Sequence, residues 1–257
     1  MTNKLITMTS VVAVSLLSLA SAVTADADEY QTSGTVGFIP STEVVPPHNP
    51  DEPEDEVTPV DPTRPDGKPE PGMPGPLSID FASSFNFGTH TITNKNVSYD
   101  AEAQEIQTKG EDTHVPDYVQ VSDYRGNRAG WTLQLSQNGQ FKTNDAQHPS
   151  VLDGAVISLD DSYAVGLTNA VAPDTYNTSL SPDGSKTVIM EAEKGEGTGT
   201  WMMPWGYDGD LKPDKENGNM LIDPKVRLSM PGTTPRDAAT CTTTLTWTLI
   251  NVPLQQK

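Results

Sequence analysis

The chain has 257 residues, a formal net charge of −19, only 6% aromatic residues and one cysteine. So acidic a surface repels polyanions, which excludes nucleic acid as a partner and argues against direct retention by anionic wall polymers. One cysteine excludes an internal disulfide framework, so a packed core must supply the stability.

Residues 1–27 have the pattern of a secretory signal peptide. Lys4 precedes an apolar stretch over residues 11–20, and small-residue cleavage sites follow at 20–22 and 25–27. No later stretch approaches the roughly 18 to 20 apolar residues that cross a bilayer. Residues 251–257 carry no pattern for covalent attachment to a wall. We therefore expect a secreted protein with no membrane span, so any retention at the cell surface must be noncovalent.

Residues 28–40 contain one short strand pattern, in which Val36 and Phe38 share a face. A proline-rich acidic segment follows at 41–76. It contains nine acidic residues and only two basic ones, Arg64 and Lys68. This composition predicts an extended, self-repelling chain that buries no core. A single strand is not stable alone, so we expect 28–40 to pair with the later domain. That pairing favours an inserted loop at 41–76 over a spacer or stalk.

Residues 77–257 alternate apolar and polar side chains in short runs, and residues 101–107 are the only local helix candidate. Asn138-Gly139 predicts a two-residue type I′ hairpin. The pattern predicts an all-β domain, an antiparallel β-sandwich or barrel. The expected strands are 77–81, 85–87, 91–93, 118–122, 130–137, 140–142, 155–159, 187–192, 198–203, 226–230 and 242–251.

A Trp-x-Leu element occurs twice, as Trp131 with Leu133 and as Trp247 with Leu249. Each lies in an alternating run that places its tryptophan and leucine on the same face of a strand. Two interpretations remain open for these rings. They pack a core that joins the two elements, or their faces stack on the C–H groups of sugars.

Trp201 and Trp205 lie beside methionines and a proline, so we expect them nearer to solvent, as possible contacts; local packing is the alternative. Cys241 shares the parity of Trp247 and fits a small buried apolar residue better than a reactive thiol. A loop with four acids could offer oxygen ligands to calcium, but its spacing lacks the full EF-hand pattern and a solvated loop is favoured. Those four acids are Asp208, Asp210, Asp214 and Glu216.

No catalytic motif stands out in the sequence. The four histidines have no metal-ligand spacing, and there is no nucleophile elbow. Two carboxylates of a glycosidase need only meet in space, so sequence alone leaves that possibility open. We expect a protein that binds rather than catalyses, with no metal and no cofactor.

The two Trp-x-Leu elements with their flanks closely resemble the WxL domain of surface proteins from low-GC Gram-positive bacteria. The resemblance covers residues 75–254, and residues 34–40 fit the family's N-terminal edge. Cys241 departs from the aromatic residue that is commoner there, and residues 207–219 look like an inserted acidic loop. The matching segments include 75–81, 85–88, 119–123, 125–126, 130–133, 137–141, 195–201, 228–232 and 244–249.

The resemblance implies an exported β-rich protein that binds peptidoglycan noncovalently, acts beside other cell-wall surface proteins and has no catalytic activity. Two hypotheses follow. The chain is a wall-binding protein, or it is a structural subunit of a cell-surface complex held by a protein partner.

Overall fold

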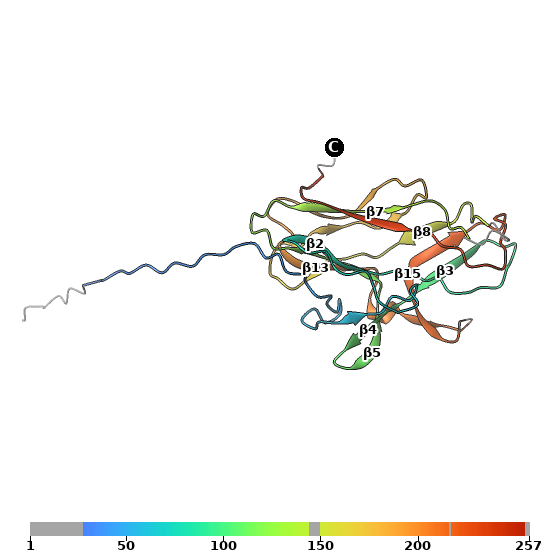
Figure 1. The fold of residues 1–257 in the computed structure, drawn as a ribbon, viewed down its shortest axis with the longest axis horizontal. Coiled ribbons are helices and arrows are strands. Elements are labelled where there is room, and N and C mark those ends of the chain that lie inside the picture. The colour runs from blue at the N-terminus through green and yellow to red at the C-terminus, as the bar shows by residue number, and fades with distance from the viewer. Residues whose placement is uncertain (1–27, 144–149, 216, 255–257) are drawn as a thin grey trace, which may run out of the picture. The chain divides into compact units, whose positions relative to one another are not determined.

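The computed structural model describes residues 28–143, 150–215 and 217–254, so the expected signal peptide lies outside the described residues. The chain forms two units, residues 1–37 and 38–257, and the second contains every described strand (Figure 1). Residues 28–40 form no strand and are exposed throughout. Val36 and Phe38 are 76% and 91% exposed, so the strand predicted there is not formed in the described structure.

The second unit is built from antiparallel strands, with one 3-10 turn, η1 (Asp208–Asp210), as its only described helical element. The all-β antiparallel prediction is confirmed. The strands form four separate hydrogen-bonded sheets, which neither a closed barrel nor a simple two-layer sandwich describes. The chain has 20 glycines and 22 prolines, which favour turns and short strands because proline lacks the N–H that a ladder needs.

Two of the sheets carry the residues of interest. The central sheet has the order β2 (Leu77–Ala82), β6 (Tyr118–Asp123), β13 (Gly199–Pro204) and β9 (Val165–Gly166). The motif sheet has the order β10 (Asp174–Thr175), β12 (Thr187–Ala192), β7 (Trp131–Gln137) and β16 (Leu245–Ile250).

The other two sheets complete the unit. One has the order β11 (Thr178–Ser179), β8 (Val156–Leu159), β15 (Met220–Met230) and β14 (Lys212–Asp214), and β3 (Val97–Glu102) also pairs with β15. The smaller one has the order β1 (Thr58–Pro59), β4 (Gln104–Thr108) and β5 (Glu111–Val115).

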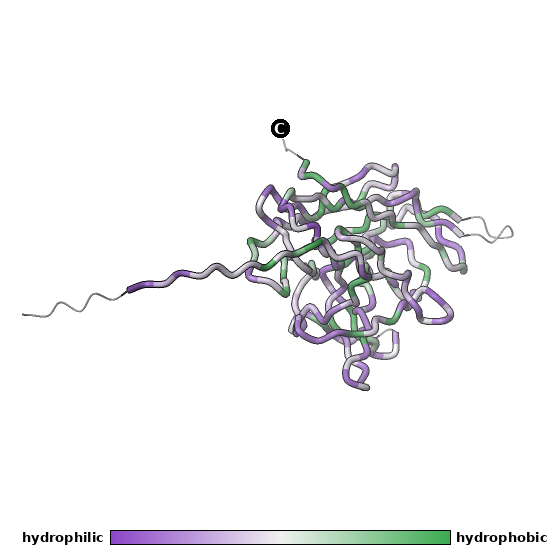
Figure 2. Tube along the Cα trace, turned by 60° about the vertical axis from the view of Figure 1, so that its left-hand side comes forward, coloured by the Kyte–Doolittle hydropathy of each residue, from purple (hydrophilic) through white to green (hydrophobic). Residues whose placement is uncertain are grey.

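The central sheet is buried on both faces. Along β13, Trp201 and Met203 belong to a large apolar cluster shared with the motif sheet and with β8 and β15. Met202, between them, belongs to a second cluster that includes Ile106 of β4. This follows from the alternation of side chains between the two faces of a strand. Along the whole trace, hydrophobic and hydrophilic stretches are short and interspersed (Figure 2).

The proline-rich segment 41–76 packs against the central sheet. Gln120 of β6 is fully buried; its Oε1 accepts a hydrogen bond from the His48 N–H (2.8 Å) and its Nε2 donates to the Pro46 carbonyl (2.9 Å). Val57 is buried and β1 pairs with β4. The expectation that this segment buries nothing is therefore wrong. It docks because backbone groups of the segment form hydrogen bonds with the buried side-chain amide of Gln120.

Several local predictions fail in the described structure. Residues 101–107 belong to β3 and β4 rather than to a helix, and Ala101 and Ile106 are fully buried. The segments 85–87 and 91–93 form no strand. Gly139 has a positive φ of 95° but Asn138 does not, so the turn is not type I′, which needs positive φ at both central residues.

Candidate binding surface

The two Trp-x-Leu elements lie side by side on the motif sheet. Strands β7 and β16 pair antiparallel, with Leu133 opposite Leu249 and Leu135 opposite Trp247. Residues opposite each other in this register point to the same face of the sheet, and side chains two positions apart along a strand also share a face. Trp131 therefore lies on the same face as these four side chains. Trp131, Leu133 and Leu135 are fully buried, while Trp247 and Leu249 are half-buried against the same core. The repeat thus builds one packed face from two distant segments.

Trp131 is fixed by the glycine-rich run that follows β12. Its Nε1 donates a hydrogen bond to the Gly197 carbonyl at 3.0 Å. A Cβ at Gly197 would lie 2.7 Å from that nitrogen and 2.4 Å from the Ala192 Cβ, and Gly197 has a φ of 64°. Only glycine accommodates both this conformation and this contact. The run 195–199 therefore forms part of the packing around Trp131.

Trp201 and Trp205 are buried, at 4% and 0% exposure, so the expectation that they lie near solvent is wrong. Trp201 belongs to the central sheet, and other elements cover both faces of that sheet. A side chain on either face of the strand is therefore buried. The Trp205 ring contacts Phe85 edge-on at a centroid distance of 5.7 Å and Trp247 at 6.3 Å. Of the four tryptophans, only Trp247 retains partial exposure.

Arg125 joins the ends of the two motif strands. Its guanidinium forms a bidentate pair with the buried carboxylate of Asp123, at 2.9 and 2.8 Å. It also donates to the Gly130 carbonyl, just before β7, and to the Asn251 carbonyl, just after β16. One planar side chain thus fixes the start of one motif strand against the end of the other.

A buried acidic pair joins the start of β6 to β15. The Asp223 carboxylate accepts hydrogen bonds from the backbone N–H groups of Asp117 (3.0 Å) and Lys225 (2.9 Å). Both carboxylate oxygens of Asp117 are buried without a hydrogen-bond partner. Burial raises the pKa of Asp223 to about 7, and burial followed by the proximity of Asp223 raises the pKa of Asp117. Neither side chain reaches the surface, so the pair offers no substrate site.

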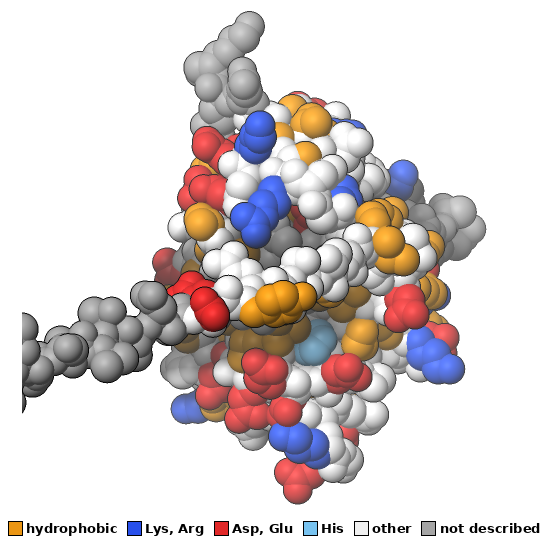
Figure 3. Space-filling view, turned by 90° about the vertical axis from the view of Figure 1, so that its left-hand side faces the viewer, with side chains coloured by type: hydrophobic (Ala, Val, Ile, Leu, Met, Phe, Trp, Pro, Cys, Tyr) orange, Lys and Arg blue, Asp and Glu red, His pale blue; other side chains and the backbone are white. Residues whose placement is uncertain are grey.

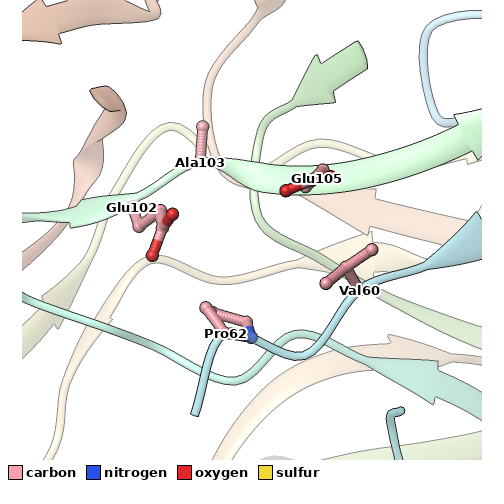
Figure 4. Close-up of a pocket in the computed structure, with 5 residues that line it drawn as sticks. All are labelled: Val60, Pro62, Glu102, Ala103 and Glu105. Atoms are coloured by element: carbon pink, nitrogen blue, oxygen red, sulfur yellow. The ribbon is translucent and has the colours of Figure 1, made fainter. Parts of the chain in front are cut away.

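The described pockets offer no aromatic face. One, of about 240 Å³, is lined by Val60, Pro62, Ala103 and the carboxylates of Glu102 and Glu105, both drawn at its edge in Figure 4. A second, of about 510 Å³, is lined by aliphatic and small polar residues without a ring. A sugar entering either pocket would therefore find no ring to stack on.

An exposed aromatic platform lies on the surface instead. The rings of Tyr163 and Tyr207 stack at a centroid distance of 4.5 Å and an angle of 16°, and Tyr207 is 57% exposed. Burial, followed by the charge of Asp51 and the neighbouring Tyr207, raises the pKa of Tyr163 to about 12, so its phenol stays neutral. Sequence reasoning missed this pair, because its members are distant in sequence and neither belongs to a motif.

The acidic loop behind Tyr207 is held by its own hydrogen bonds. The Asp210 carboxylate accepts from the Tyr207 N–H at 3.0 Å, and Asp214 accepts from the Asn217 amide at 2.6 Å. Glu216 lies outside the described residues. Within residues 28–143, 150–215 and 217–254, no group of three or more histidine, cysteine or acidic side chains could hold a metal ion.

Acidic side chains also gather in the lower part of the face drawn in Figure 3. Near the tyrosines, partial desolvation and the charge of Asp208 raise the pKa of Asp51. This environment favours a neutral or cationic ligand over an anionic one.

The sequence matches the model of one protein family, described as WxL domain, surface cell wall-binding, over residues 25–253. The matched range includes the proline-rich segment together with all the strands. No curated protein and no solved structure matches the chain. Among the described residues, no helix has the length and apolarity needed to cross a membrane.

Proposed function

Because the chain belongs to the WxL family of cell wall-binding surface domains, we propose that it binds peptidoglycan noncovalently and catalyses no reaction. The observation that carries this proposal is the family match over residues 25–253. We assign residues 1–27 to a signal peptide that is removed on secretion across a Gram-positive envelope. Residues 77–257 form the wall-binding domain, and the loop 41–76 docks on it.

The Tyr163–Tyr207 platform is the proposed contact. A sugar ring stacks its C–H groups on an exposed aromatic face, and Tyr207 offers such a face while Trp131, Trp201 and Trp205 do not. The acids Asp51 and Asp208 beside it suit the amino groups of peptidoglycan stem peptides. In this proposal the Trp-x-Leu residues act structurally, by building the sheet that supports the surface.

Sedimentation with purified peptidoglycan tests the proposal. The secreted form, residues 28–257, is mixed with peptidoglycan stripped of proteins and of anionic polymers, and the pellet is assayed. We expect the protein in the pellet, with saturation as its concentration rises. Complete recovery in the supernatant, with the protein folded by its thermal melt, would contradict peptidoglycan binding.

The second candidate function is a structural subunit held at the surface by a protein partner. The observation that favours it is the exposure of Val36, Phe38 and Ile39, apolar side chains that a partner would cover. Display of the protein is measured on cells that lack the neighbouring wall proteins. Unchanged display would count against this second function.

A further inference from the structure

A segment with the sequence pattern of a strand, but no partner, lies at the start of the described chain. In residues 34–39, the apolar Val36 and Phe38 are two positions apart, so they would share one side of the segment in a strand conformation. None of these residues makes a hydrogen bond in the described structure, and Ile39 is 92% exposed. Pro40 follows directly and ends the pattern. The segment, here called the free strand, therefore exposes both apolar side chains and a complete set of backbone donors and acceptors.

A strand edge without a partner ends the folded unit. Strand β16 is the last strand of the motif sheet and pairs with β7 alone among the described residues (Figure 1). The Thr244 carbonyl, just before β16, accepts a hydrogen bond from the Asn138 N–H, so even-numbered residues direct their backbone groups toward β7. Antiparallel alternation then directs those of Leu245, Trp247 and Leu249 to the open side.

These two unpaired features fit each other in length and charge. The segment 34–39, which Pro40 bounds, is long enough to pair with the whole of β16, Leu245–Ile250. Neither carries a charged side chain in a chain whose formal net charge is −19. Most other contacts between two copies of so acidic a protein meet mutual repulsion, whereas pairing of two neutral strands avoids it.

We infer that residues 34–39 of one copy add to the open edge of β16 in a second copy, as an additional strand of the motif sheet. The backbone groups of Leu245, Trp247 and Leu249 form the new ladder, and Val36 and Phe38 become covered. The free strand and the edge of β16 are different surfaces, so the contact is heterologous. It either continues from copy to copy as an open chain or closes into a dimer when two copies exchange their free strands. This inference does not depend on wall binding.

A labelled peptide of residues 30–40 tests the pairing in trans. The acceptor is residues 41–257, which lacks the free strand but keeps the docked loop and every described strand. Fluorescence anisotropy is expected to show saturable binding. A Val36→Pro peptide, which lacks one ladder N–H, is expected to bind at least tenfold more weakly, and a Gln31→Pro peptide, changed outside the free strand, is expected to bind as the parent does. Equal binding of all three peptides, or no binding, would overturn the inference.

Amide hydrogen exchange locates the acceptor. Peptide binding is expected to slow exchange at Trp247 and Leu249, and unchanged exchange there would overturn the assignment to β16. In residues 28–257, self-association measured by sedimentation velocity is expected to rise with concentration and to be lost in Val36→Pro, whose exposed position leaves folding unaffected. If the protein stays monomeric at every concentration and the Val36 amide is nevertheless protected from hydrogen exchange, the free strand pairs within its own chain. The inference would then be wrong.

Discussion

At the scale of single residues, Trp131 is the anchor of the motif sheet. Its ring is fully buried and its Nε1 hydrogen bond ends on the Gly197 carbonyl. Trp131→Ala is expected to lower the free energy of unfolding by about 3 to 5 kcal/mol, through lost burial and the cavity left behind. Chemical denaturation of residues 28–257 measures this. A loss below about 1 kcal/mol, typical of a surface substitution, would contradict the core role.

The buried pair Asp117 and Asp223 predicts a pH dependence of stability. The unfolded chain releases the Asp223 proton near its ordinary pKa of 3.8, whereas the folded protein keeps it until about pH 7. The folded state therefore binds more protons at Asp223 between these values. The contribution of Asp223 to stability is complete below about pH 4 and is lost as the pH rises through 7. One such group contributes at most about 1.4 kcal/mol per pH unit.

Asp223→Asn isolates that contribution. The substitution removes the titrating proton, so the free energy of unfolding of the variant should decline less than that of the parent between pH 4.5 and pH 7.5. Denaturant titrations at both pH values provide the comparison. Parallel declines in parent and variant would show that Asp223 titrates alike in the folded and unfolded states.

Strand parity predicted the partners of Trp131 but not the burial of Trp201 and Trp205. Parity assigns a side chain to one face of a strand, and exposure then depends on what covers that face. The central sheet is covered on both faces, so its alternation provides no solvent side. The Tyr163–Tyr207 stack had no local signal at all, since only the fold brings the two rings together.

At the scale of elements, β16 completes the motif sheet by pairing with β7 along its full length. Removing the final 12 residues deletes Trp247 and all of β16 except Leu245, and leaves Leu133 and Leu135 uncovered. We expect the truncated protein to unfold, because its core loses a strand that packs against Trp205. A cooperative thermal melt near that of the full chain would refute this role for β16.

Arg125 makes a second prediction at this scale, since it joins the ends of β7 and β16. Arg125→Ala leaves the buried carboxylate of Asp123 without its cation and frees the Gly130 and Asn251 carbonyls. We expect a loss of about 3 kcal/mol in the free energy of unfolding, in the range for breaking a buried ion pair. The double variant with Asp123→Asn is expected to recover part of it; recovery of nothing would indicate that the carbonyl contacts alone matter.

Strong alternation located most long strands, among them β2, β6, β7, β12 and β13, close to their observed bounds. It failed at β3 and β4, whose hydrophilic sequence gave no clear period, because pairing with β15 and β1 stabilises them rather than their own pattern. The docked loop 41–76 was missed for a related reason. Composition describes the isolated chain, and the buried amide of Gln120 that receives Pro46 and His48 belongs to another segment.

At the scale of the whole molecule, the family membership indicates a ligand in the cell wall, and the net charge of −19 indicates that this ligand is not an anionic polymer. A neutral or cationic component of the wall tolerates this field, whereas an anionic polymer does not. The fold buries three of its four tryptophans and leaves a tyrosine platform exposed. The tryptophans therefore build the domain, and we propose that the exposed tyrosines contact the wall.

Sedimentation of matched variants with purified peptidoglycan tests this division of roles most directly. Tyr207→Ala removes the exposed ring, Tyr207→Phe keeps the ring without its hydroxyl, and Trp247→Phe alters a motif residue but keeps an apolar ring. With all three folded by thermal melt, we expect Tyr207→Ala to stay in the supernatant and the other two to sediment as the parent does. Normal sedimentation of Tyr207→Ala together with loss of binding in folded Trp247→Phe would contradict the account and place the wall contact at the motif itself.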